Sequence, residues 1–583
     1  MATVPRCAPS RLIQYLLSVD GFFGNIIAKM SESASTRPVT EGPAPQLSPW
    51  WLSVIVFGGL LGLGLWLAPP LYNFDGYMYR LQGRNPLENL NPTHLIWVPI
   101  QAVIWQVCDW FHWSSPLPFQ VVGIGFSALA HALFFRLLAR RPALIPLALA
   151  STVFVATSPW VWQLTPINQP YPLLFLLVVL LLFVWRKVPD RPATLVGLGG
   201  LILLAALLQE AAGLWWGAVV GLLVGLTPGP PGQRWRRAIV WGVSVAAAVG
   251  SAFWIAAVLV EVDSVRGFFA WITGYAQSQH GLLQRPIANL VKSGMGIGQS
   301  LIHCDRLVDW LQQRYPPAQI LTGTAVVEIG ALVAGLAALC FRRPRRWVQH
   351  WPWRTPLFLA SLALAGVWAV FCVVWEPTGY YWSVALFPLL TAAVLLLEPA
   401  PAGSRWLVIG LLLAGTVWNF HENRRVDHQN GPRFPDPQLA RIRQVVRPQD
   451  ELLFLQQVWI DQVDYDLLVN CLEHGGRTNT ITLVEKYLTA SPLNWEVPLA
   501  HEINAVLSQG GRVYISNLVF RPELYDDLAG DSAFSTYSIE ANHSIQGPAL
   551  FARVQQFFEH YHREPAELQL GTDRFWVVTR RAD

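Results

Sequence analysis

The sequence predicts a polytopic α-helical membrane protein of about 11 spans, followed by a soluble α/β domain. First, only 13% of its 583 residues are charged, about half the share found in soluble globular proteins. Second, apolar runs of about 20 residues, the length that crosses a hydrocarbon core, recur before residue 420. Third, the 28 Trp are typical of aromatic belts at two membrane interfaces.

Eleven apolar runs are long enough to be spans, and the Arg-rich loops between them fix their sidedness. The expected spans are 48–68, 120–138, 143–160, 170–187, 192–208, 210–227, 237–260, 321–341, 355–375, 380–397 and 404–419. The run 94–111 is interpreted as a partly embedded helix, because four basic loops then share the side of the N-terminus, as the positive-inside rule requires. These loops are 136–142, 185–192, 232–237 and 341–354.

Three regions follow from this topology. Residues 1–47 form a cytoplasmic segment, and the stretch that begins at Met30 resembles an ordinary amino terminus, which suggests an upstream mis-start. Residues 48–420 form the membrane domain with outer loops 69–119 and 261–320, and amphipathic surface helices are expected in the second loop. Residues 421–583 form an extracytoplasmic domain. We therefore expect a multi-pass protein of the inner or plasma membrane.

The C-terminal domain alternates helix and strand patterns. We expect helices in "PQLARIRQVV" and "AHEINAVLSQGG", and strands in "ELLFLQQ", "RVYISNL" and "RFWVVTRR". Neither GxGxxG nor a P-loop occurs there, so no nucleotide site is predicted. The net charge of +4 comes without a basic stripe interleaved with aromatics, so nucleic acid is not an expected partner.

The outer loops hold most polar and aromatic residues, which predicts a site on the outer face. Asp75 ends the first span among Asn73, Tyr77, Tyr79 and Arg80. A carboxylate in such a position can accept a proton from an attacking hydroxyl or amine. The alternative interpretation is an interfacial acid in contact with water.

Further acids end other spans, and a histidine follows Asp75 in the first loop. Glu210 and Glu376 join Asp75 and His94 as candidate catalytic residues, and together they predict a polar cavity in the outer leaflet. His94 would orient the acid or bind phosphate. The alternative is that its segment starts the next helix, because Asn91 and Thr93 supply capping oxygens.

A lipid-phosphate leaving group needs cations, and a sugar needs aromatic and hydrogen-bonding side chains. The candidate phosphate-binding residues are Arg80, Arg84, Arg285 and Lys292, for which a headgroup contact is the alternative. The candidate sugar- or acceptor-binding residues are Tyr77, Trp162, Gln169, Tyr380 and Tyr381. The alternative for the aromatic residues of this set is that they anchor the protein at the membrane–water interface.

Residues 48–420 resemble the GT-C superfamily of integral membrane glycosyltransferases. The resemblance is carried by Asp75 after the first span, the step "NPTHLIWVPI", and the spans "INQPYPLLFLLVVLLL" and "EPTGYYWSVALFPLLTAAVLLL". The pattern looks most like the branch of protein O-mannosyltransferases and aminoarabinose lipid A transferases. It implies a polyprenyl-phosphate-linked sugar donor and a glycan, lipid or protein acceptor. It also implies inversion at the anomeric carbon with Asp75 as the general base, in glycosylation at the cell envelope.

Cofactors and alternative functions stay open at this point. Some relatives carry two adjacent acids in the first loop where this chain has only Asp75, so a divalent metal stays possible but is not supported by a paired-acid motif, and no cofactor is certain. Cys304 and Cys471 both face outward in this topology, which leaves a disulfide open. A transporter or lipid flippase would use the same outer cavity, although no paired repeat is visible. A non-catalytic scaffold is the third hypothesis.

Overall fold

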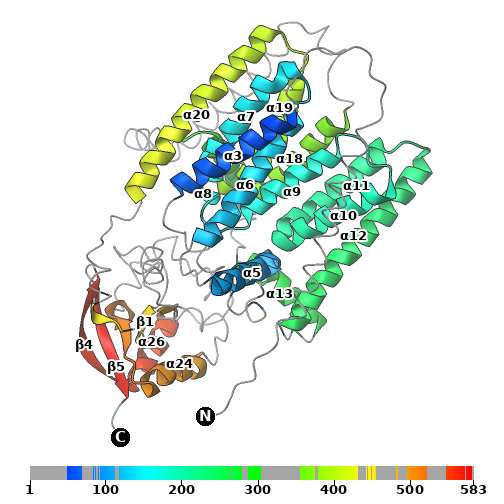
Figure 1. The fold of residues 1–583 in the computed structure, drawn as a ribbon. Coiled ribbons are helices and arrows are strands. Elements are labelled where there is room, and N and C mark those ends of the chain that lie inside the picture. The colour runs from blue at the N-terminus through cyan, green and yellow to red at the C-terminus, as the bar shows by residue number, and fades with distance from the viewer. Residues whose placement is uncertain are drawn as a thin grey trace. The chain divides into compact units, whose positions relative to one another are not determined.

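The protein is mostly helical, with one five-stranded sheet near the C-terminus (Figure 1). The computed structural model describes residues 49–68, 83, 86, 90, 92–111, 117–260, 262, 264–278, 286–303, 355–374, 379–430, 442, 444–447, 449–454, 481–483, 495–520, 547–570 and 573–580. The expected segment 1–47, the expected span 321–341, and both Cys304 and Cys471 lie outside the described residues.

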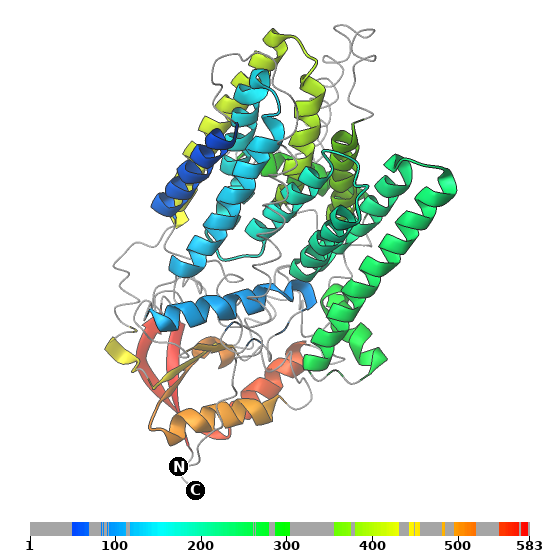
Figure 2. The ribbon, with the colours of Figure 1, turned by 45° about the vertical axis from the view of Figure 1, so that its right-hand side comes forward.

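Long apolar helices form a bundle (Figures 1 and 2). They are α3 (Pro49–Leu67), α6 (Leu117–Leu138), α7 (Ile145–Thr157), α9 (Tyr171–Val184), α10 (Pro192–Leu208), α11 (Trp215–Leu226), α12 (Pro231–Leu259), α18 (Pro356–Val374), α19 (Gly379–Leu397) and α20 (Ala402–Asn430). The short helix α8 (Pro159–Leu164) joins α7 to α9. Proline in the first turn fixes the start of α7, α8, α9, α10 and α12, where no backbone N–H is needed.

Length and composition allow five of the described helices to cross a membrane, namely α3, α6, α12, α18 and α19. α7, α9, α10 and α11 are apolar but shorter. Every expected span within the described residues falls on a bundle helix. The fold is therefore that of a multi-pass helical protein, while the count of eleven crossings stays a prediction.

The outer surface of the bundle is apolar. On α12 the side chains of Val243 and Ile255 are 63% and 60% exposed, and on α20 those of Leu407 and Leu411 are both 64% exposed. Such a surface would be unstable in water but suits contact with lipid chains. The core beneath it encloses Trp97, Trp185, Trp215 and Trp368 together with many aliphatic side chains.

One helix lies across the end of the bundle rather than along it. The 3₁₀ turn η1 (Pro92–His94) leads into α5 (Trp97–Trp110), and both views show α5 crossing below the long helices (Figures 1 and 2). Its buried face includes Trp97, Val98 and Gln101. This is the orientation of a helix that does not span with its neighbours.

The second outer loop contains α13 (Val265–Ser278) and α14 (Pro286–Leu301). Surface-lying helices were expected here, but α14 packs against α18 and α19, and Ile297 and Leu301 contact the main core. Small residues explain the close approach, because Ser293 and Ser300 are buried on the α14 face. The two helices are present as expected, and their position at the membrane surface stays a prediction.

Basic loops gather at the end of the bundle away from α5. Glu398 accepts a hydrogen bond from Arg140 (Nη2–Oε2 2.7 Å) and forms an ion pair with Arg141 (Nε–Oε1 3.1 Å). Arg186, just beyond α9, lies within electrostatic reach of Arg136 and Arg140. Two of the loops predicted to share a side, 136–142 and 185–192, therefore meet at one end.

Replacing Glu398 with glutamine is expected to lower the free energy of unfolding by about 1 kcal/mol, because two guanidinium groups would lose their carboxylate partner in a half-buried position. The measurement is the unfolding midpoint in detergent micelles. The matched control is Asp190→Asn, which removes an exposed acid from the 185–192 loop. Equal midpoints for the two variants would contradict the expectation.

The C-terminal domain is built on a mixed sheet. Its elements are β1 (Glu451–Phe454), β2 (Ile481–Leu483), α24 (Glu496–Ser508), β3 (Val513–Ser516), η6 (Asn517–Phe520), α26 (Gly547–Phe558), β4 (Tyr561–Leu570) and β5 (Asp573–Arg580). The strand order is β2-β1-β3-β5-β4. β1 pairs in parallel with β2 and β3, whereas β5 is antiparallel to both β3 and β4.

A compact apolar core holds this domain together. Leu453, Val513, Ile515 and Val578 from the sheet pack with side chains of α24 and α26. The strands expected in "ELLFLQQ", "RVYISNL" and "RFWVVTRR" appear as β1, β3 and β5, and the helix expected in "AHEINAVLSQGG" appears as α24. β2, β4 and α26 were not anticipated.

Candidate functional site

The predicted site residues divide into described and undescribed sets. Asp75, Tyr77, Arg80, Arg84, Arg285 and Glu376 lie outside the described residues. Lys292 belongs to α14, and its side chain is likewise outside the described part. The described candidates are His94, Trp162, Gln169, Glu210, Tyr380 and Tyr381. Each of these six lies at or near the end of the bundle where α5 crosses.

His94 is docked on the carboxyl end of α10. Its Nδ1 lies 2.9 Å from the Leu208 carbonyl oxygen, and the backbone N–H of Ile96 donates to the Leu207 carbonyl at 3.0 Å. The last carbonyls of a helix lack intrahelical partners, so η1 and the residues after it satisfy two of them. Because a carbonyl only accepts, Nδ1 carries the proton and Nε2 is an acceptor in the neutral ring.

Burial decides the charge of His94. Loss of solvent lowers the pKa of this imidazole to about 4, although the bond to Leu208 opposes the shift. At neutral pH the ring is therefore uncharged. An uncharged imidazole can orient or accept a hydrogen bond, but it supplies no positive charge to a phosphate.

Glu210 lies close to the same point. It is the first residue of η3 (Glu210–Leu214), the 3₁₀ turn that joins α10 to α11, and η3 packs against η1. The carboxyl group is half-buried. The structure thus brings together His94 and Glu210, two candidates that come from different loops.

Buried amides surround the first turn of α5. Trp97 donates from Nε1 to the backbone carbonyl of Asn168 (3.3 Å), and Asn168 donates from Nδ2 to Gln101 Oε1 (2.9 Å). Asn168 has φ 57°, a left-handed conformation that asparagine tolerates better than most residues. Gln169 follows it and is only 4% exposed. These amides come from α5 and from the α8–α9 turn.

Two of the buried amide groups lack a partner within the described residues, namely Gln101 Nε2 and Gln209 Oε1. Buried polar atoms are normally satisfied, so these two groups indicate contacts with segments outside the description or with a ligand. The first outer loop reaches this point. A Cβ added at Gly83 would lie 2.5 Å from Gln101 Cβ, so the loop backbone presses against α5.

Aromatic side chains form a cluster beside the amides. Tyr380 packs against Tyr171 and Tyr381, with ring centroids 5.5 Å and 4.0 Å away, and against Trp160 at 6.0 Å. Tyr381 is 4% exposed and packs on Phe371, so it belongs to the core more than to a surface. Tyr380 is the more accessible of the two predicted tyrosines.

Trp162 points to a second polar cluster, on the last turns of α20. Its Nε1 donates to Asp427 Oδ2 at 3.2 Å. Nearby, Asn423 accepts from His303 (Nε2–Oδ1 2.6 Å) and donates to the Thr157 carbonyl (2.9 Å). Asn419 and Glu422 are also buried there.

Sequence reasoning missed this second cluster because the expected span ended at 419, whereas α20 continues to Asn430. The sequence nevertheless contains a pattern that predicts this cluster. Asn419, Glu422 and Asn423 recur at three- and four-residue spacing, which places them on one helix face.

Replacing Asn423 with leucine is expected to destabilise the protein by about 1–3 kcal/mol, because His303 and the Thr157 carbonyl would stay buried without their partner. Asn423→Asp is the matched variant: it keeps an acceptor for His303 but replaces the donor to Thr157 with a buried carboxylate oxygen, so it is expected to be destabilised as well. Unfolding in detergent measures both. A leucine variant as stable as the wild type would contradict the role given to this amide.

The described side chains at this end of the bundle are polar and include both hydrogen-bond donors and acceptors. No group of three His, Cys, Asp or Glu side chains could hold a metal ion among the described residues. A neutral imidazole, a carboxyl group, buried amides and an accessible tyrosine can together orient a polyhydroxylated ligand and accept protons from it.

Two solved structures of archaeal origin are similar to the chain. One is the oligosaccharyltransferase AglB from Archaeoglobus fulgidus in complex with an inhibitory peptide and a dolichol-phosphate; the identity is 12% and the TM-score 0.43, over 91% of this chain and 74% of that one. The other is an Archaeoglobus fulgidus oligosaccharyltransferase tethered by a disulfide to an acceptor peptide with the NVT sequon; the identity is 13% and the TM-score 0.42, over 89% and 72%.

No protein-family model and no curated protein matches the chain. TM-scores of 0.43 and 0.42 are too low to establish a common fold. The function proposed below therefore rests on the residues of this chain.

Proposed function

We propose that the protein is a membrane glycosyltransferase that moves a sugar from a polyprenyl-phosphate donor to an acceptor on the outer face. The observation that carries the proposal is the docking of His94 on the end of α10 beside Glu210. The two residues lie at the end of the bundle opposite the Arg140–Glu398 ion pair. A polar, partly buried site at a membrane surface is what such a reaction requires.

Asp75 would act as the general base. It would take the proton of an acceptor hydroxyl or amine as that group attacks the anomeric carbon, and the bond between this carbon and the phosphate oxygen would break. One displacement of this kind inverts the configuration at the anomeric carbon. The sugar is transferred and the polyprenyl phosphate leaves.

The leaving phosphate needs cations, and the neutral His94 would not be one of them. Arg80, Arg84, Arg285 and Lys292 remain the candidates, since they belong to the predicted outer loops 69–119 and 261–320, which contain α5 and α14. His94 and Glu210 would instead orient sugar hydroxyls. Gln101, Gln169 and the neighbouring Asn168 would add hydrogen bonds, and Tyr380 would offer an aromatic face.

The Gly83 contact supports a place for Asp75 near this site. Gly83 touches α5 at Gln101, and Asp75 precedes it by only eight residues. An extended chain covers at most about 3.6 Å per residue, which is compatible with the proposed position of Asp75 near α5 and η1.

The test is a bond-breaking assay. Purified protein is reconstituted in liposomes without any ion or voltage gradient and given a synthetic polyprenyl-phosphate donor with a labelled sugar. The expected result is that the label leaves the lipid and appears on an acceptor or in water. Movement of the intact donor lipid between leaflets, with no release of label, would overturn the proposal in favour of a flippase.

A further inference from the structure

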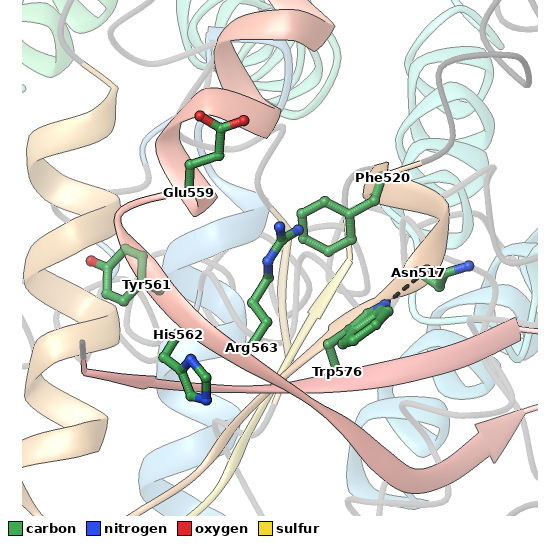
Figure 3. A pocket seen from close by; sticks show the side chains of 7 residues that line it. All are labelled: Asn517, Phe520, Glu559, Tyr561, His562, Arg563 and Trp576. Atoms are coloured by element: carbon green, nitrogen blue, oxygen red, sulfur yellow. Dashed lines mark hydrogen bonds between the residues drawn. The ribbon is translucent and has the colours of Figure 1, made fainter. Parts of the chain in front are cut away.

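A cavity of about 730 Å³ lies on the C-terminal domain at the β5–β4 side of the sheet (Figure 3). Its walls come from η6, from the turn that follows α26, and from β4 and β5. Its size is in the range of about 300–1,000 Å³ that is typical of small-molecule sites. No step of the proposed transfer uses it.

The strand register builds the floor of this cavity. Arg563 pairs with Val578, and Pro565 with Trp576, so Arg563 and Trp576 share one face of the sheet. Helices α24 and α26 cover the rest of that face, where Val578 is buried. The cavity is the end of this face that the helices leave open.

Two contacts hold the polar groups of the cavity in place. The guanidinium of Arg563 lies 4.1 Å from the ring centroid of Phe520, a stacking arrangement that leaves its N–H groups pointing outward. The indole Nε1 of Trp576 donates to Asn517 Oδ1 at 2.8 Å, which fixes the ring and directs the Asn517 NH₂ to another partner. No ion pair of Arg563 occurs among the described residues.

The side chains that line the cavity include aromatic rings, hydrogen-bond donors and hydrogen-bond acceptors. Trp576 and Tyr561 offer flat rings, Arg563 and Asn517 offer donors, and Glu559 at the end of α26 offers acceptors. One acid and one permanent cation cancel each other's charge. The site thus suits an uncharged ligand that has one apolar face and many hydroxyl groups.

We infer that this cavity binds a saccharide unit. The C–H face of a pyranose stacks on an aromatic ring, because its slightly positive hydrogens meet the negative ring face. Its hydroxyl groups both donate and accept, so they can bond to Arg563, Asn517 and Glu559 alike. A phosphate would be attracted by Arg563 but repelled by Glu559, and a lipid chain would offer the Arg563 guanidinium no acceptor.

The experiment is ligand-observed NMR on the full-length protein in detergent micelles. The probes are neutral disaccharides of glucose, mannose, galactose and N-acetylglucosamine, with inorganic phosphate and a neutral pentapeptide as separate arms. At least one disaccharide is expected to bind, and phosphate is not. Binding of phosphate or of the peptide alone would overturn the inference.

Variants locate the binding. Arg563→Gln and Trp576→Ala are each expected to weaken the disaccharide affinity by about tenfold, whereas Trp576→Phe, which keeps a ring, should stay within about threefold. Arg574→Gln is the matched control, because this exposed arginine lies on β5 outside the cavity. Unchanged affinity in Arg563→Gln, with an unchanged unfolding midpoint, would place the saccharide elsewhere.

The inference goes beyond the proposed transfer, since binding needs neither donor lipid nor Asp75. The Asp75→Asn protein is therefore expected to bind the disaccharide as the wild type does. Failure of sugar release with intact disaccharide binding would remove only the proposed transferase function. Intact release with no disaccharide binding would remove only the saccharide site.

Discussion

Replacing Asp75 with asparagine is expected to lower sugar release from a polyprenyl-phosphate donor by about 10²–10⁴-fold, the usual contribution of a general base. Asparagine has the same shape as aspartate but cannot take the proton of the attacking hydroxyl. Donor affinity should change little, because the amide still accepts hydrogen bonds. The measurement is single-turnover release of labelled sugar by protein in liposomes.

The control for this variant is Asp109→Asn, which neutralises an exposed acid on α5 at the same end of the bundle. This control tests whether neutralising another carboxylate at this end of the bundle lowers sugar release through the loss of charge alone. Near-normal release is expected. If Asp75→Asn released sugar within twofold of the wild type, Asp75 would have no part in the reaction. Glu210, in contact range of η1, would then be the next acid to examine.

Most helices could be predicted because their cause is local. In α9 and α10 a proline in the first turn marks the start of the helix, and the apolar run that follows favours burial or contact with lipid. Both signals lie within the segment itself. The strands β1, β3 and β5 were predictable for a similar reason, since each is a short apolar run near turn residues. β2 has only three residues, and β4 reads "YHREPAELQL" with a proline inside, so neither carries a clear strand pattern.

The candidate site was only partly predictable because its contacts join distant parts of the chain. His94 was singled out in its loop, but its bond to Leu208, 114 residues away, has no local signal. The same holds for the amide pair of Asn168 and Gln101. Periodicity also left the partner of α14 open, because its amphipathic pattern fits a surface helix as well as a helix packed on α19. Helical periodicity shows which face is buried but not which partner covers it.

His94 is expected to make the protein less stable in acid. Its pKa is about 4 in the folded protein and near 6.5 when unfolded. Between these values the unfolded chain binds a proton that the folded protein does not, so acid favours unfolding. The stabilisation is fully present above about pH 6.5 and is lost as the pH falls toward 4, where the loss reaches about 3 kcal/mol.

The variant His94→Asn separates this effect from other titrations. The asparagine amide can still donate to the Leu208 carbonyl, and it does not titrate. Unfolding midpoints in detergent at several pH values from 7.5 to about 4.5 are expected to fall less steeply for this variant than for the wild type. The control is His501→Asn, an exposed histidine on α24, which should leave the slope unchanged.

Other ionisable groups lie on elements packed against η1, and the same experiment tells them apart. Glu210 belongs to η3 and Arg266 to α13, while α10 carries no ionisable side chain. Burial raises the pKa of Glu210 to about 7, so this carboxyl gains a proton on folding and favours the folded state as the pH falls. A slope that persists in His94→Asn would therefore assign the acid sensitivity to a group farther away. A slope that disappears would show that His94 is buried as a neutral ring, as its proposed role in orienting a sugar rather than holding a phosphate requires.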